Sequence, residues 1–276
     1  MSLRINQNID AANSYRNLSV TQGQMSKSLE KLSSGFRINR AADDASGLAI
    51  SEGLRSQVGG LKVGARNAQD GVSLVQTAEG ALTEVHSMLQ RMNDLAVQYN
   101  SGTQNADSQK ALEDEFGQLQ TEITRIQENT KFNGELLFDG TTDRTFQVGY
   151  DSNDTITVAA ATGLTEFATD IAALDIKEAA DAADPTAGAS NKVQAQITAI
   201  SAQRAELGAT QNRFEHTINS VNVAIENLSA SESRIRDTDM AQEMMSFTRS
   251  QILSQAGTAM LSQANQAPQG VLSLLR

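Results

Sequence analysis

The sequence has no cysteine or tryptophan and is poor in proline and in aromatic residues. Without cysteine, disulfides, thiol catalysis and thiolate metal sites are excluded. Only two prolines, Pro185 and Pro268, occur in 276 residues, well below the share of about 5% that is usual in proteins. Aromatic residues make up 4% of the chain, so large core anchors are few. This composition leaves little to stop a helix, and it favours a protein of long helices over an ordinary globule.

The formal net charge of −11 argues against general nucleic-acid binding. No run approaches the length of about 18 apolar residues that marks a membrane span, so we expect no membrane-spanning segment. The amino-terminal stretch MSLRINQNIDAANS lacks the apolar core of a secretory signal. If the chain leaves the cell, we expect a route without a cleaved signal.

Apolar residues recur at alternating spacings of four and three in five segments, which predicts helices with coiled-coil-like stripes. The first stripe comprises Ala11, Tyr15, Leu18, Gln22, Met25, Leu29, Leu32 and Phe36. The last comprises Leu253, Gly257, Met260, Ala264, Ala267, Val271 and Leu274. Three inner stripes run over 54–99, 112–126 and 193–228. Pro268 lies in the last stripe and predicts a kink or an interruption of that helix.

The middle of the chain carries signals for turns and strands. KFNGELLFDGTTD (131–143) contains Asn-Gly and Asp-Gly, which are both turn signals. RTFQVGY and TITV alternate apolar and polar residues on either side of DSND, which predicts a β-hairpin. The Ala-rich segment 160–190 is expected to be a loop with short irregular structure.

Two polar joints, 37–46 and 233–239, lie at matching distances from the two ends and make the chain near-symmetric about its middle. The predicted fold is mainly α: a coiled-coil-like bundle of long helices with paired terminal helices and a small β-hairpin region. We expect a terminal helical domain from 1–45 and 234–276. A helical bundle over 46–233 would carry the hairpin at about 130–165.

Residues at the joints fit helix ends. Asp43 and Asp44 precede the longest predicted helix, where carboxylates suit the positive end of the helix dipole. Asp239, followed three residues later by Gln242, has the pattern of a capping box. A paired-carboxylate site at Asp43 and Asp44 is the less favoured interpretation.

Motifs of catalysis are missing from the sequence. It has no Gly-rich phosphate loop and no HExxH, and its two histidines, His86 and His216, lie on separate predicted helices without a Glu-x-x-His pair. We therefore expect no enzyme, no cofactor and no metal. A helical-bundle metalloenzyme stays open as an alternative that stoichiometric metal in the purified protein would revive. A membrane-active amphipathic protein is the other alternative, but after Glu243 only Arg249 and Arg276 are charged, which suits an anionic membrane poorly.

Several segments together resemble a known family. SLRINQNIDAANSYRNL, SLEKLSSGFRINRAADDASGLAIS and the ending SQILSQAGTAMLSQANQAPQGVLSLLR resemble the terminal signatures of bacterial flagellin, the filament subunit. DGVSLVQTAEGAL and TKFNGELLFDG fit the same family. The resemblance covers about 1–150 and 190–276. It departs in the middle, where the large outer domains of many flagellins have no counterpart in this chain.

The resemblance implies a structural subunit that polymerises into the bacterial flagellar filament for swimming. Export, unfolded, through the flagellum-specific type III apparatus and an extracellular location follow from it. The paired terminal helices would form the inner tube of the filament, and the bundle with its hairpin the outer tube. A hook–filament junction protein of the same architecture is the alternative, although VLSLLR and the stretch 35–51 favour flagellin.

The resemblance also implies partners and site residues. The partners would be other copies of the chain, an export chaperone at the C-terminal tail, the filament cap and hook-junction proteins, and a host Toll-like receptor, with no nucleic acid and no membrane. Subunit contacts on the terminal helices are expected at Leu18, Met25, Leu29, Leu32, Leu253, Met260, Val271 and Leu274. The joint between the domains is expected at Arg37, Asn39, Arg40, Asp43 and Asp44. The receptor site is expected at Gln90, Arg91, Leu95 and Glu122.

Overall fold

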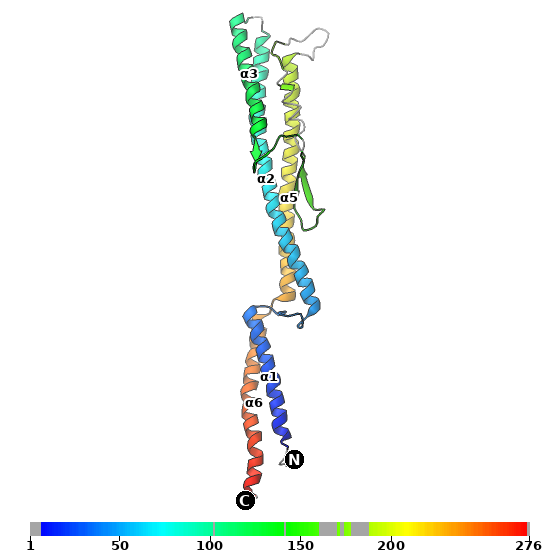
Figure 1. Cartoon of the computed structure of the whole chain (residues 1–276), viewed down its shortest axis with the longest axis vertical. Helices are drawn as coiled ribbons and strands as arrows, with labels where there is room; N and C mark the ends of the chain where they lie inside the picture. Colours follow the sequence, from blue (N-terminus) through cyan, green and yellow to red (C-terminus); the bar gives the residue numbers. More distant parts are fainter. Residues whose placement is uncertain are drawn as a thin grey trace. The chain divides into compact units, whose positions relative to one another are not determined.

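The computed structural model describes residues 7–101, 103–140, 142–159, 170–171, 174–177 and 188–274, with side chains as far as residue 266. Its helices are α1 (Ile9–Ser34), α2 (Ala45–Tyr99), α3 (Ala106–Asn129), α5 (Ala189–Arg236) and α6 (Met240–Leu274) (Figure 1). The strands are β1 (Lys131–Phe132), β2 (Glu135–Leu136), β3 (Arg144–Gln147) and β4 (Thr155–Val158). The predicted mainly-α class is confirmed. Most of 160–190, where a loop is expected, lies outside the described residues.

The chain divides into two compact units. The terminal unit comprises residues 1–56 and 226–276, and the bundle unit comprises 57–225. α2 and α5 each contribute residues to both units, because each helix runs unbroken across the division.

Capping side chains mark where the helices begin and end. Gly35 adopts a left-handed conformation (φ 77°) and its N–H donates to the carbonyl of Lys31, which ends α1. Asp44 accepts from the N–H of Gly47 at 2.9 Å at the start of α2. Asp239 accepts from the N–H groups of Ala241 and Gln242 at 2.9 and 3.1 Å at the start of α6. The helix-start roles predicted for Asp44 and Asp239 are therefore confirmed.

The bundle unit has an apolar core between α2, α3 and α5. Its members share the inner faces predicted from the stripes, and those that are almost fully buried include Leu82, Val85, Leu89, Met92, Phe116, Ile123, Val193 and Ile200. Burial of this apolar surface is the main force that holds the three helices together. α2 keeps one face inward over its whole stretch in this unit, as the predicted spacing requires.

Two antiparallel hairpins follow α3. The predicted hairpin is confirmed as β3 and β4, with Phe146 opposite Ile156. A second, very short hairpin pairs β1 with β2 around Asn133 and Gly134, both at positive φ, which is the pattern of an Asn-Gly hairpin turn. The turn predicted from Asn133 and Gly134 is therefore confirmed, and it joins two short strands.

The larger hairpin packs directly on the bundle. The ring of Phe146 meets that of Phe214 edge to face, with centroids 5.6 Å apart. A Cβ atom at Gly64 of α2 would lie 2.6 Å from the carbonyl carbon of Val148, so only glycine lets the residue that follows β3 approach α2 this closely. Glycine inside the long helix therefore serves close packing at this point.

In the terminal unit α1 and α6 lie side by side and antiparallel, as the sequence predicts (Figure 1). Of the predicted kink or interruption at Pro268, the interruption does not occur, since α6 continues to Leu274. Proline has no N–H to donate to the carbonyl four residues earlier, that of Ala264. The side chain of Asn8 donates to this carbonyl at 2.8 Å and replaces the missing bond. The pairing with α1 thus removes part of the cost of Pro268.

Candidate assembly surface of the terminal helices

The contact between α1 and α6 is made mostly by small and polar side chains. We call this set the seam: its members are buried or half-buried and recur every three or four residues. On α1 they are Ala11, Ser14, Leu18, Thr21, Met25, Ser28 and Leu32. On α6 they are Glu243, Phe247, Ser250, Ser254, Gly257, Leu261 and Ala264.

Gly257 shows how close the two helices come. A Cβ atom built on Gly257 would lie 3.3 Å from Cδ1 of Leu18, which is tighter than an ordinary van der Waals contact. Nearby, the hydroxyl of Ser254 lies 3.4 Å from Oε1 of Gln22 and donates to it. Ser28 and Ser250 are each only 7% exposed. Small residues therefore let the helices approach closely at these positions.

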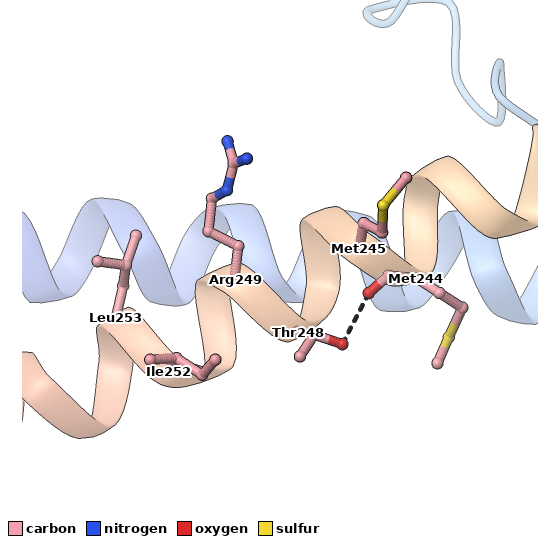
Figure 2. Close-up of a pocket in the computed structure, with 6 residues that line it drawn as sticks. All are labelled: Met244, Met245, Thr248, Arg249, Ile252 and Leu253. Carbon is pink, nitrogen blue, oxygen red and sulfur yellow. Dashed lines mark hydrogen bonds between the residues drawn. The ribbon is translucent and has the colours of Figure 1, made fainter.

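Further large apolar side chains of the terminal pair lie outside the seam and stay exposed. We call this set the outer face: Tyr15, Val20, Leu29, Met240, Met244, Met245, Ile252, Leu253 and Met260, each about half exposed or more. Figure 2 shows part of it along α6, where six side chains line a shallow groove of about 540 Å³. Arg249 is the one charged residue among those six. An apolar face of this length in water is typical of a surface that binds another protein.

The structure divides the predicted contact residues into two groups. Leu18, Met25 and Leu32 lie in the seam, whereas the side chains of Leu29, Leu253 and Met260 point outward and are more than half exposed. The side chains of Val271 and Leu274 lie outside the described residues. Leu29, Leu253 and Met260 lie on the predicted stripes but outside the seam, so the seam follows the stripes only in part. The neighbouring residues Ser28 and Ser254 lie in the seam, and Leu29 and Leu253 lie outside it.

At the joint, a short backbone ladder connects the end of α1 to the turn between α5 and α6. The N–H of Arg37 donates to the carbonyl of Arg236 at 2.7 Å, and the N–H of Thr238 donates to that of Gly35 at 3.0 Å. The guanidinium of Arg37 also donates to the carbonyl of Ile235 at 2.6 Å. The predicted joint residue Arg37 thus ties together two segments that lie about 200 residues apart in the sequence.

Arg236, within the predicted joint 233–239, contributes its side chain to this joint. Its guanidinium lies 4.7 Å from the ring centroid of Phe36 and pairs with the carboxylate of Glu52 at 2.6 Å. The side chain of Arg236 is 14% exposed and that of Glu52 is 53% exposed, so the pair is shielded from water on the arginine side. Ile38, two residues after Phe36, is buried at 2% exposed. Arg234 and Arg236 lie in the last turn of α5, inside the joint predicted at 233–239.

The remaining predicted joint residues shape the turn between α1 and α2. The Asp43 carboxylate accepts from the N–H groups of Arg40 and Asn39 at 3.0 and 3.2 Å, and these bonds lower the pKa of Asp43. Because the pKa of Asp43 is lower in the folded chain, its carboxylate stabilises the turn at pH values above its unfolded-state pKa. This stabilisation is lost as the pH falls through the pKa of the folded state. Arg40 pairs with Glu30 at 2.9 Å. Asp43 thus stabilises the turn, and Asp44 alone caps the helix.

The four residues of the expected receptor site lie in the bundle unit and have different environments. Arg91 on α2 pairs with Glu115 on α3 at 2.7 Å. Glu122 pairs with Arg125 at 2.5 Å, and the hydrogen bond from Arg125 lowers the pKa of Glu122. Gln90 is exposed. Leu95 is fully buried in the core of the bundle, so its side chain supports the helix and does not face a partner.

Neither a metal cluster nor a membrane span is found in the part of the chain that the structure describes. Across these residues, no three His, Asp or Glu side chains gather closely enough to hold a metal ion. Among the described helices, none combines the length and the hydropathy needed to cross a bilayer.

Comparison with known proteins identifies the family. Residues 5–143 match the bacterial flagellin N-terminal helical region, and residues 190–275 match the bacterial flagellin C-terminal helical region. A flagellin of Halalkalibacterium halodurans is 53% identical, with 99% of each chain covered. A flagellin of Bacillus subtilis is 48% identical, with 99% of this chain and 100% of that one covered. The flagellar filament 33 kDa core protein of Treponema phagedenis is 45% identical, with 99% of each covered. These matches span nearly the whole sequence, and the chain therefore belongs to the bacterial flagellin family.

Proposed function

We propose that the outer face of α1 and α6 is the surface through which this chain joins other copies of itself. The chain is a structural subunit of the bacterial flagellar filament, an extracellular polymer that serves motility. A hook–filament junction protein is not favoured, because relatives named flagellin match the chain from end to end. The observation that carries the proposal is the set of large apolar side chains that stays exposed outside the seam, while small and polar residues make up most of the seam.

The energetics of the terminal pair support this role. Burying an apolar side chain contributes roughly 1.5–3 kcal/mol, but Ser250, Ser254 and Gly257 bury little apolar area. Leu253, Ile252 and Met260, which would contribute more, stay 51%, 60% and 63% exposed. In a polymer, every subunit would bury such a face against its neighbours. The terminal pair then gains most of its stabilisation on assembly.

We propose that the terminal domain, 1–45 with 234–276, forms the inner tube of the filament and that the bundle, 46–233, forms the outer tube. The terminal pair supplies the apolar outer face that a close-packed inner layer needs. Arg37, Asn39, Arg40, Asp43 and Asp44, together with Arg236, would hold the joint between the two domains. Replacing Arg236 with Gln should leave the bundle folded while filament yield falls. An unchanged yield would argue against a role for the joint.

Electron microscopy of the purified chain tests the function directly. Added to short filament seeds, the protein should grow filaments many times longer than the seeds, since each bound subunit presents a fresh outer face. Growth that stops after one layer of subunits would instead support a junction protein. We further infer that the chain has no catalytic role, and turnover of any substrate by filaments would contradict this.

An export chaperone and the filament's cap and hook-junction proteins are proposed as further partners. Before assembly, the outer face of α6 is apolar and nearly uncharged, so a partner that covers it would prevent aggregation. A chaperone should bind a peptide of residues 238–276. Equal binding to a chain that ends at residue 235 would refute this assignment.

A Toll-like receptor of a host is proposed as a partner of the bundle. Gln90, Arg91 and Glu122 offer polar groups on α2 and α3, and Arg91 is partly engaged by Glu115. Replacing Arg91 with Ala should reduce receptor signalling in reporter cells. A Leu95→Ala variant is not a test of contact, because Leu95 lies in the core. Full signalling by the Arg91 variant would exclude this site.

A further inference from the structure

In the part of the chain whose side chains are described, the exposed methionines all lie on α6. Among the residues that the structure describes, Met25 and Met88 are half-buried and Met92 is fully buried. The four on α6 are exposed, and they are Met240, Met244, Met245 and Met260, at 48%, 51%, 67% and 63%. All four belong to the outer face. Met244 and Met245 also line its groove, next to Ile252 and Leu253 (Figure 2).

These side chains carry the reactive sulfur of the molecule. The chain has no cysteine, so the thioethers are its only sulfur groups. A hydroperoxide oxidises methionine by oxygen transfer: the sulfur lone pair attacks one peroxide oxygen, the O–O bond breaks, and the leaving oxygen takes up a proton as water or alcohol. The product, methionine sulfoxide, is polar and can be reduced back enzymatically. Exposed methionines are oxidised faster than buried ones, so the methionines of α6 should be oxidised first.

We propose that Met240, Met244, Met245 and Met260 form a reversible oxidation site at which hydroperoxides block addition of the free subunit to the filament. The inference rests on the proposed role of the outer face in assembly. A sulfoxide oxygen placed on this face would be buried against an apolar neighbour without a hydrogen-bond donor, which disfavours the contact. Oxidised subunits are thus rejected, whereas subunits already assembled keep their methionines covered.

The first measurement maps the oxidation. Free chain and preformed filaments are treated with hydrogen peroxide, and each methionine is followed by peptide mass spectrometry. In the free chain, the α6 methionines should oxidise on the order of tenfold faster than Met92, because exposure governs access. Equal rates at Met92 and at the α6 positions would overturn the proposal. In filaments the oxidation rates of the α6 methionines should fall, because assembly covers them. If the rates stay the same while oxidation still blocks growth, the proposal that assembly buries the outer face is contradicted. The proposal of an oxidation site on α6 is then supported.

The second measurement links oxidation to growth. Seeded growth is compared for each protein before and after peroxide, so that every variant serves as its own reference. The wild-type chain should lose growth on the order of tenfold, and treatment with methionine sulfoxide reductases should restore it. For a chain with all four α6 methionines replaced by leucine, the ratio of growth after peroxide to growth before it should stay near one. The matched control Met92→Leu should respond as the wild type does. Equal peroxide loss in the leucine variant, or no recovery after reduction, would overturn the proposal.

Discussion

A chain carrying Ile252→Gln, Leu253→Gln and Met260→Gln is expected to stay folded and to form no filaments at concentrations where the wild type polymerises. The three side chains are exposed in the free subunit, so their replacement removes little contact within it. Each would lose about 1 kcal/mol of apolar burial in the polymer, since the side chains are already half covered. Together this amounts to about 3 kcal/mol, or on the order of a hundredfold in critical concentration. Sedimentation of seeded mixtures measures it.

The matched control keeps the apolar surface and changes only its shape. Ile252→Val, Leu253→Met and Met260→Leu together should raise the critical concentration far less than the glutamine variant does, because conservative apolar changes cost little. Circular dichroism should report the same helix content for both variants. If the glutamine variant polymerised as readily as the conservative one, the outer face would not be the assembly surface.

The second large effect is expected in the bundle unit. Replacing Phe214 with Ala should lower the free energy of unfolding by about 3–5 kcal/mol, the usual cost of deleting a buried aromatic ring. Phe214 is fully buried, and its ring packs edge to face on Phe146 of the hairpin. Gly71 of α2 faces the same ring: a Cβ atom there would lie 2.6 Å from Cζ. The ring thus joins α5 to α2 and to β3, and denaturant unfolding followed by circular dichroism measures its loss.

Val223 offers a control on the same helix. Its side chain is 58% exposed, so Val223→Ala should change the free energy of unfolding by no more than about 0.5 kcal/mol. If both variants unfolded at the same denaturant concentration, the cluster around Phe214 would not hold the hairpin to the bundle.

The bundle could be predicted well from the sequence because its pattern and its packing agree. Leu82, Leu89 and Val193 lie at predicted stripe positions and are fully buried. In this unit the partners of each apolar stripe belong to the same chain. Apolar residues at helical spacing therefore mark the intramolecular contact. The hairpin was predictable for the same reason, since Phe146 and Ile156 alternate with polar neighbours.

For the terminal helices, the face that makes the contact within the chain could not be predicted. Leu29 and Ser28 are adjacent, and so are Leu253 and Ser254, and a rule that chooses the larger apolar residue selects the wrong face in both cases. That rule assumes that the largest side chains are buried within the subunit. Here the structure covers the serines and exposes the leucines. A sequence with two candidate faces on one helix does not show which of them its own chain covers.

Contacts between residues that lie far apart in the sequence could not be predicted either. Nothing in the spacing of Arg236 indicates that it lies over Phe36 and reaches Glu52. The bond from Asn8 to the carbonyl of Ala264 is equally invisible, although it explains how α6 continues past Pro268. Both contacts join segments far apart in the chain, and only the folded terminal unit brings them together.

The central claim is that the terminal helices pair through the seam, which is mostly small and polar, and assemble through the large apolar residues of the outer face. Cryo-electron microscopy of the native filament, at a resolution that shows side chains, tests it most directly. The account predicts that Ser250 and Gly257 contact α1 of their own subunit and that Leu253 and Met260 pack against a neighbouring subunit. A filament in which Leu253 and Met260 face solvent, with subunits joined elsewhere, would contradict it.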